Sequence, residues 1–70
     1  PVKHSLTLRG HRTSVTLEPP FWDALRDIAS ERGLAVNALA AEIDAVRALD
    51  VGLATALRLY ILDWYRSRCL

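Results

Sequence analysis

The sequence predicts a mainly α-helical domain in which one β-strand precedes three helices, assembled as an intertwined homodimer. Residues 12–17 alternate polar and apolar side chains, whereas the chain after Pro19 follows helical spacing. No second strand is predicted after residue 17, so the backbone of residues 12–17 needs a pairing partner from another chain. A domain of 70 residues is also marginally stable alone, and a partner subunit is the expected supplement.

The predicted strand covers residues 12–17, RTSVTL. Val15 and Leu17 face one side of this strand, and Arg12, Ser14 and Thr16 face the other. Two copies of the segment, related by a two-fold axis, would form an antiparallel ribbon between the two chains. The apolar side chains would then face a shared core, and the polar side chains would lie on one exposed face.

Residues 1–11 are predicted to form a basic arm outside the strand. Leu6 and Leu8 alternate on even positions, out of phase with residues 12–17, and the phase changes around Gly10. This change indicates a bulge, a bend or the start of the strand. A hairpin that turns at Gly10 is an alternative, although Gly-His is a poor two-residue turn.

The positive charge of the chain is concentrated near its N-terminus. The formal net charge is only +1, but residues 1–17 contain Lys3, Arg9 and Arg12 and no carboxylate, since the first acid is Glu18. A basic segment without acids suggests either an anionic partner or a solvated tail.

Three helices are predicted, at residues 19–32, 36–48 and 51–67. Pro19 and Pro20 stop the strand and suit the first turn of a helix, whereas Gly33 suits its end. Ala35 stands where a capping hydroxyl is expected, so Asn37 is the nearest side chain able to cap the second helix. The third helix is apolar over a broad arc, which is typical of a helix packed on more than one side. The predicted dimer core consists of Val15, Leu17, Leu25, Ile28, Leu39 and Ile43.

The residues do not indicate an enzyme, a cofactor or a metal site. His4 and His11 stand apart from other metal-ligating side chains, and the single cysteine, Cys69, excludes an intrachain disulfide. No apolar run approaches the roughly 20 residues of a membrane span, and the N-terminus lacks the apolar segment of a signal peptide. We therefore expect a single cytoplasmic domain over residues 1–70, without an internal repeat.

The chain resembles the ribbon-helix-helix (Arc/MetJ-type) DNA-binding family over about residues 12–47. The resemblance rests on the strand, the proline-led helix that ends in Gly33 and the LAVNAL turn into the second helix. The segment GHRTSVTLEPPFWDALRDIA is similar to a bacterial branch of that family. Two features depart from the family pattern: Ala35 replaces the usual hydroxyl cap, and minimal members lack the third helix.

The resemblance implies a ribbon that reads bases in the major groove and helix starts that contact phosphates. The implied base-contacting residues are Arg12, Ser14 and Thr16. The implied phosphate contacts are the backbone groups of Val36 and Asn37. Further candidates for phosphate contacts are Lys3, Arg9 and His11.

The sequence thus predicts a homodimeric, sequence-specific protein that binds double-stranded DNA and regulates transcription. Higher oligomers, or a protein partner bound through the third helix, are compatible with this prediction. The alternative is a homodimeric interaction module, antitoxin-like or a scaffold, whose third helix docks a partner protein.

Overall fold

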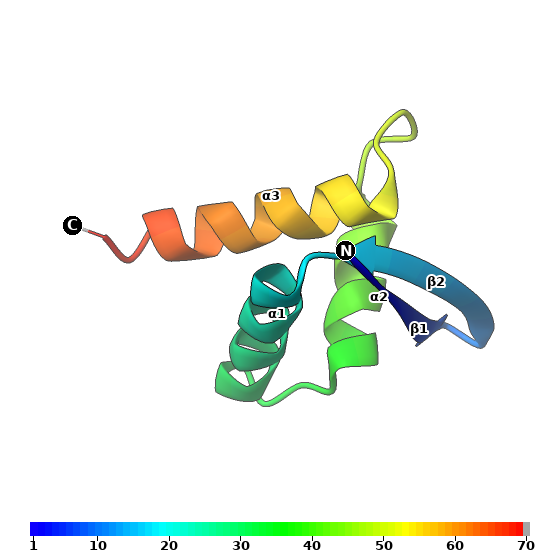
Figure 1. Ribbon diagram of the computed structural model, residues 1–70, viewed down its shortest axis with the longest axis horizontal. Coiled ribbons are helices and arrows are strands. Elements are labelled where there is room, and N and C mark those ends of the chain that lie inside the picture. Colours follow the sequence, from blue (N-terminus) through cyan, green and yellow to red (C-terminus); the bar gives the residue numbers. More distant parts are fainter. Residues whose placement is uncertain (70) are drawn as a thin grey trace.

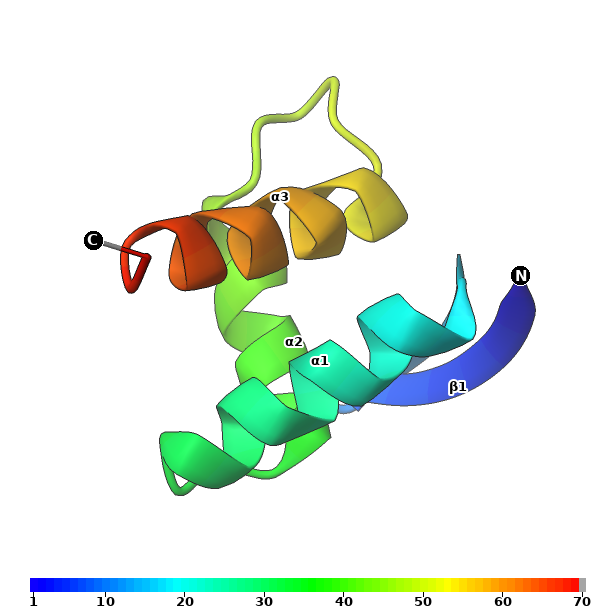
Figure 2. The same cartoon turned by 60° about the vertical axis from the view of Figure 1, so that its left-hand side comes forward.

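The computed structural model describes residues 1–69 as a two-stranded antiparallel hairpin followed by three helices. The elements are β1 (Val2–Leu8), β2 (His11–Leu17), α1 (Pro19–Glu31), α2 (Val36–Val46) and α3 (Leu53–Arg66). In Figure 1, α3 lies across α1 and α2, and the hairpin lies at the opposite end of the molecule from the C-terminus. Figure 2 shows that the loop between α2 and α3 stands out beyond α3.

Residues 2–8 form a strand, which corrects the prediction of a basic arm over residues 1–11. The register of β1 against β2 runs from Val2↔Leu17 to Leu8↔His11. The two residues between the strands, Arg9 and Gly10, have positive φ angles of 52° and 84°. A two-residue type I′ turn requires positive φ at both central positions. The turn therefore lies one residue earlier than the Gly-His pair considered in the sequence.

Residues 12–17 pair with β1 of their own chain, which corrects the expectation that their pairing partner must come from another chain. The register places each even-numbered residue of β1 opposite an odd-numbered residue of β2. Even positions of β1 and odd positions of β2 thus share one face. The change of phase around Gly10 is therefore the signature of the hairpin and not of a bulge.

The hydrophobic core is complete within one chain. All six residues predicted for a dimer core are buried, and Leu17, Leu25 and Leu39 have no exposed surface. Leu6 and Leu8 join this core from β1. The third helix closes it with three buried side chains, Ala56, Leu57 and Ile61. These residues consequently form the core of a single chain and need no second subunit to cover them.

The helix ends follow from local chemistry. Pro19 and Pro20 occupy the first turn of α1, and Gly33 ends this helix with a φ angle of 70°. The Leu34 N–H donates to the Ala29 carbonyl at 2.8 Å, and the Gly33 N–H donates to the Ser30 carbonyl at 3.1 Å. These two bonds form a Schellman motif. The later helices are shorter than predicted, since α2 ends at residue 46 and α3 begins at residue 53.

Gly10→Ala is expected to lower the free energy of unfolding by about 1–2 kcal/mol, because alanine resists the left-handed conformation. A Cβ atom at position 10 would meet no other atom within 4 Å, so the cost arises in the backbone alone. Gly52→Ala is the matched control, since Gly52 has a φ angle of −67° and equally open surroundings. Urea unfolding followed by circular dichroism measures both variants. Equal destabilisation by the two would contradict the turn assignment.

Candidate functional site

The face of the hairpin that points away from the helices carries only polar and basic side chains. They form three cross-strand pairs: Lys3↔Thr16, Ser5↔Ser14 and Thr7↔Arg12. All of these residues are exposed. We call this surface the outer face of the hairpin. It includes the three side chains predicted to contact bases, and the strand that pairs with them belongs to the same chain.

Sequence reasoning missed two residues of the outer face, Ser5 and Thr7, because residues 1–11 were predicted to be an arm. It also predicted Lys3 as a phosphate contact, whereas the structure places Lys3 on the same face as Arg12. The signal that could have revealed them is the alternation of Leu6 and Leu8, which leaves their odd-numbered neighbours on the opposite side of the strand.

The other two predicted basic contacts lie outside the outer face. Arg9 occupies the turn at the tip of the hairpin. His11 is an odd-numbered residue of β2, like Val15 and Leu17, and therefore lies on the side that faces the helices. There it lines a shallow hollow together with Asp44 and Arg47. The structure therefore separates His11 from the side chains predicted to read bases.

The first carboxylate of the chain, Glu18, is paired with an arginine of α3. Both Nε and Nη2 of Arg58 donate to Glu18 Oε1, at 3.0 and 2.9 Å, and Nη2 also donates to the Thr16 carbonyl at 3.4 Å. A hydrogen bond from the backbone amide of Glu18 and the bonds from Arg58 lower the pKa of the Glu18 carboxyl. The arginine thus neutralises the acid that directly follows β2 and fixes the end of β2 against α3.

The start of α2 lies against the edge of β1. Asn37 Oδ1 accepts a hydrogen bond from the Thr7 N–H at 3.2 Å, so the Asn37 side chain binds the strand and does not cap its own helix. The first helical bond runs from the Leu39 N–H to the Ala35 carbonyl, 3.0 Å long. The N–H groups of Val36 and Asn37 precede this bond and belong to the uncapped helix start. Anion-binding donors therefore adjoin the hairpin.

Beneath the outer face, an aromatic contact attaches β1 to α1. The His4 and Trp22 rings stack with their centroids 3.8 Å apart and an interplanar angle of 5°. Within residues 1–69, no group of side chains could hold a metal ion. No helix in that range is long and apolar enough to cross a membrane. The basic and hydroxyl side chains of the hairpin are thus the candidate site.

A family model described as a ribbon-helix-helix domain matches residues 1–65. The match includes both strands and most of α3, so it extends beyond the segment that carried the resemblance in the sequence. Comparison with curated proteins and comparison with solved structures each gave no match.

Glu18→Gln is expected to destabilise the protein at neutral pH and to weaken its sensitivity to acid. Because the folded-state pKa of Glu18 is depressed, its carboxylate contributes stability above its ordinary pKa of 4.5, and this contribution is lost as the pH falls through the folded value. The measurement is urea unfolding between pH 7 and pH 3. Asp27→Asn, on an exposed position of α1, is the control. Parallel pH profiles for wild type and Glu18→Gln would contradict the role of the ion pair.

Proposed function

The chain belongs to the ribbon-helix-helix domain family, and we propose that it is a sequence-specific DNA-binding protein that regulates transcription in the bacterial cytoplasm. Ribbon-helix-helix domains are generally DNA-binding transcription regulators or antitoxins, and the fold is non-enzymatic. The choice of DNA as the partner rests on the chemistry of the hairpin in this chain.

The observation that carries the proposal is the outer face of the hairpin. The major groove of B-DNA is about 12 Å wide and admits a two-stranded β-ribbon. Arg12 and Lys3 supply donors suited to the O6 and N7 acceptors of guanine, and the serine and threonine hydroxyls suit several base edges. No carboxylate lies on this face, because residues 1–17 contain none. The surface therefore matches a polyanion that presents hydrogen-bonding groups along a groove.

Contacts with phosphates would orient the hairpin in the groove. The N–H groups of Val36 and Asn37 are assigned to one phosphate, because the uncapped start of α2 adjoins β1. Arg9 at the tip of the hairpin is assigned to a second phosphate. We leave His11 out of the interface, since it lies on the helix-facing side of the hairpin.

Arg12→Ala is expected to weaken binding to a selected DNA site by about 1–3 kcal/mol, the worth of one bidentate contact with a base. Binding to random duplex should weaken less. Thr13→Ala is the matched control, since Thr13 is an exposed neighbour on the opposite side of the same strand. Fluorescence anisotropy titrations of both variants against both duplexes measure the effect. Equal losses on selected and random DNA would argue against base reading by Arg12.

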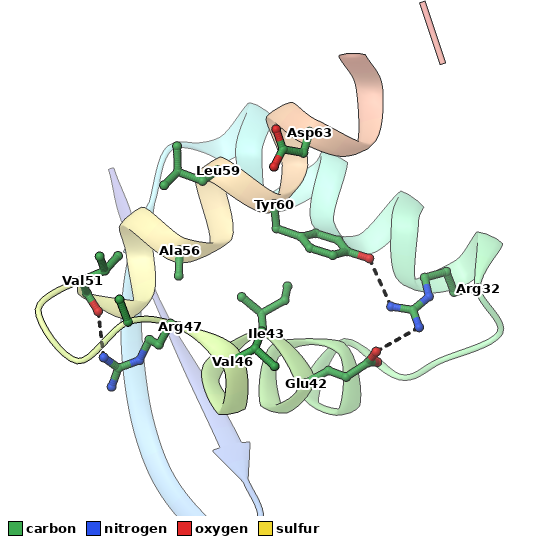
Figure 3. A pocket seen from close by; sticks show the side chains of 11 residues that line it. Arg32, Glu42, Ile43, Val46, Arg47, Val51, Ala56, Leu59, Tyr60 and Asp63 are labelled. Atoms are coloured by element: carbon green, nitrogen blue, oxygen red, sulfur yellow. Dashed lines mark hydrogen bonds and ion pairs between the residues drawn. The ribbon is translucent and has the colours of Figure 1, made fainter. Parts of the chain in front are cut away.

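A second candidate function, docking of a protein or of a second copy, is favoured by apolar surface around α3. Val46 is 83% exposed, and Leu59 and Leu62 are 52% and 48% exposed. Val46 of α2 and Leu59 of α3 are among the residues that line a cavity of about 410 Å³ (Figure 3). Exposed apolar surface of this kind is typical of interaction sites. A homodimer formed here would leave the outer face of the hairpin uncovered.

Leu59→Lys tests this second candidate. If copies of the chain associate through α3, the substitution should weaken self-association by about tenfold or more, because it places a charge in an apolar interface. Sedimentation equilibrium measures the association constant. Arg66→Lys on the same helix preserves charge and is the control. A dissociation constant unchanged by Leu59→Lys would exclude this face as the dimer interface.

A further inference from the structure

The two strands of the hairpin repeat one sequence pattern, which corrects the expectation that the chain has no internal repeat. Residues 3–8 read KHSLTL, and residues 12–17 read RTSVTL. Each segment begins with a cation, continues with serine and threonine at alternate positions, and ends in leucine. The equivalent residues lie nine positions apart in the chain.

The hairpin register converts this repeat into a two-fold symmetry. Exchanging every residue with its repeat equivalent turns the pair Lys3↔Thr16 into the pair Arg12↔Thr7, and both pairs occur in the register. The same exchange maps Ser5↔Ser14 onto itself. The outer face therefore has an approximate two-fold axis, perpendicular to the hairpin, that passes between the two serines.

Folding alone does not account for this symmetry. The outer-face side chains are exposed and form no side-chain hydrogen bond or ion pair within residues 1–69. On the helix-facing side, by contrast, the repeat is broken: His4 stacks on Trp22, whereas its equivalent, Thr13, is exposed. The aliphatic equivalents of that side, Leu6 with Val15 and Leu8 with Leu17, are explained by their burial in the core, whereas no contact within the described residues explains the equivalence of the outer-face side chains.

We propose that a single chain reads a DNA sequence with two-fold symmetry, with the axis of its hairpin placed on the dyad of an inverted repeat. This inference rests on the proposed DNA-binding function. Because the two strands of a duplex are antiparallel, a protein surface with two-fold symmetry presents equal contacts to the two halves of a palindrome. Here the two halves of the reading surface are β1 and β2 of one chain, and not two subunits.

The geometry specifies the form of the site. Lys3 and Arg12 are symmetry equivalents. Along β1, Lys3 lies four positions from Thr7, the residue opposite Arg12, so the two cations are offset by four positions along the hairpin. Four residues of a strand span roughly 13 Å, which corresponds to about four base-pair steps at 3.4 Å each. The inverted repeat therefore contains two guanines, one on each DNA strand, about four steps apart, and the central base pairs lie against Ser5 and Ser14.

Selection of bound duplexes from a random DNA pool tests the proposal, with wild-type protein and with Lys3→Ala, Arg12→Ala and the double variant. Wild-type protein should select an inverted repeat. Each single variant should keep a guanine at one end only, with discrimination at the other end reduced by about 5- to 150-fold. The double variant should lose both guanines. Arg26→Ala, which removes an exposed cation from α1 outside the hairpin, is the control and should leave the selected sequence unchanged.

The outcomes separate this inference from the proposed function. An asymmetric site, or an inverted repeat that loses both guanines in Arg12→Ala alone, would overturn the single-chain reading surface while leaving DNA binding intact. The second of these results is the one that a ribbon shared between two chains would give. If wild-type protein bound no duplex at all, the proposed function would fail and the inference would fail with it. Circular dichroism of each variant confirms that the fold is retained.

Discussion

The tight turn at Arg9 and Gly10 is the constraint on which the rest of the structure depends. Only two residues, both with positive φ angles, connect β1 to β2. Because a two-residue turn leaves one possible pairing of the strands, it fixes the register of the whole hairpin. A shift of one residue would turn every side chain of one strand to the opposite face. The turn therefore decides both which leucines reach the core and which polar side chains reach solvent. The candidate interface and the core are consequences of one local conformation.

The third helix makes the hairpin part of a single folded unit. Its buried face, which includes Leu57 and Ile61, covers the core that α1, α2 and the hairpin leave open. On the adjoining surface Arg58 bonds Glu18 and the Thr16 carbonyl, and its guanidinium carbon lies 5.8 Å from the centre of the Phe21 ring. The helix thus ties the end of β2 to the rest of the core. Ala56, Leu57 and Ile61 of α3 thus complete a core that covers the inner face of the hairpin within one chain.

The helices could be predicted from the sequence, but the hairpin could not be predicted by the same reasoning. Pro19 and Gly33 define α1 through fixed backbone preferences, which act locally and are visible in the sequence. A hairpin at Gly10 was considered with Gly-His as its turn, which is a poor two-residue turn, whereas the chain turns at Arg9-Gly10. Arginine seldom adopts positive φ, so this pair is a weaker signal than asparagine-glycine. Once β1 was interpreted as an arm, the outer-face roles of its residues could not be inferred.

Other features of the site depend on tertiary contacts that a sequence does not display. The bond from the Thr7 N–H to Asn37 joins residues 30 positions apart, and the stack of His4 on Trp22 requires β1 to lie against α1. Asn37 was recognised as a polar residue near a helix start, yet its side chain bonds the strand instead of the helix. The composition of the outer face was predictable on β2, where alternation is local, and its symmetry emerges only from the register.

If the hairpin of one chain is the reading surface, as we propose, DNA binding depends on protein concentration in a different way from binding by a ribbon shared between two chains. When two subunits must each supply a strand, the surface exists only in the dimer, and dilution removes the binding site together with the dimer. In this chain the hairpin and its core are complete without a partner, so the outer face persists at any concentration at which the monomer is folded. Self-association through α3 would then act by joining two finished hairpins, which raises affinity through effective concentration and leaves the recognition of each site unchanged. Formation of the reading surface would then depend only on folding of one chain, and binding at a second DNA site would depend on self-association. In an intersubunit ribbon, both would depend on the dimer.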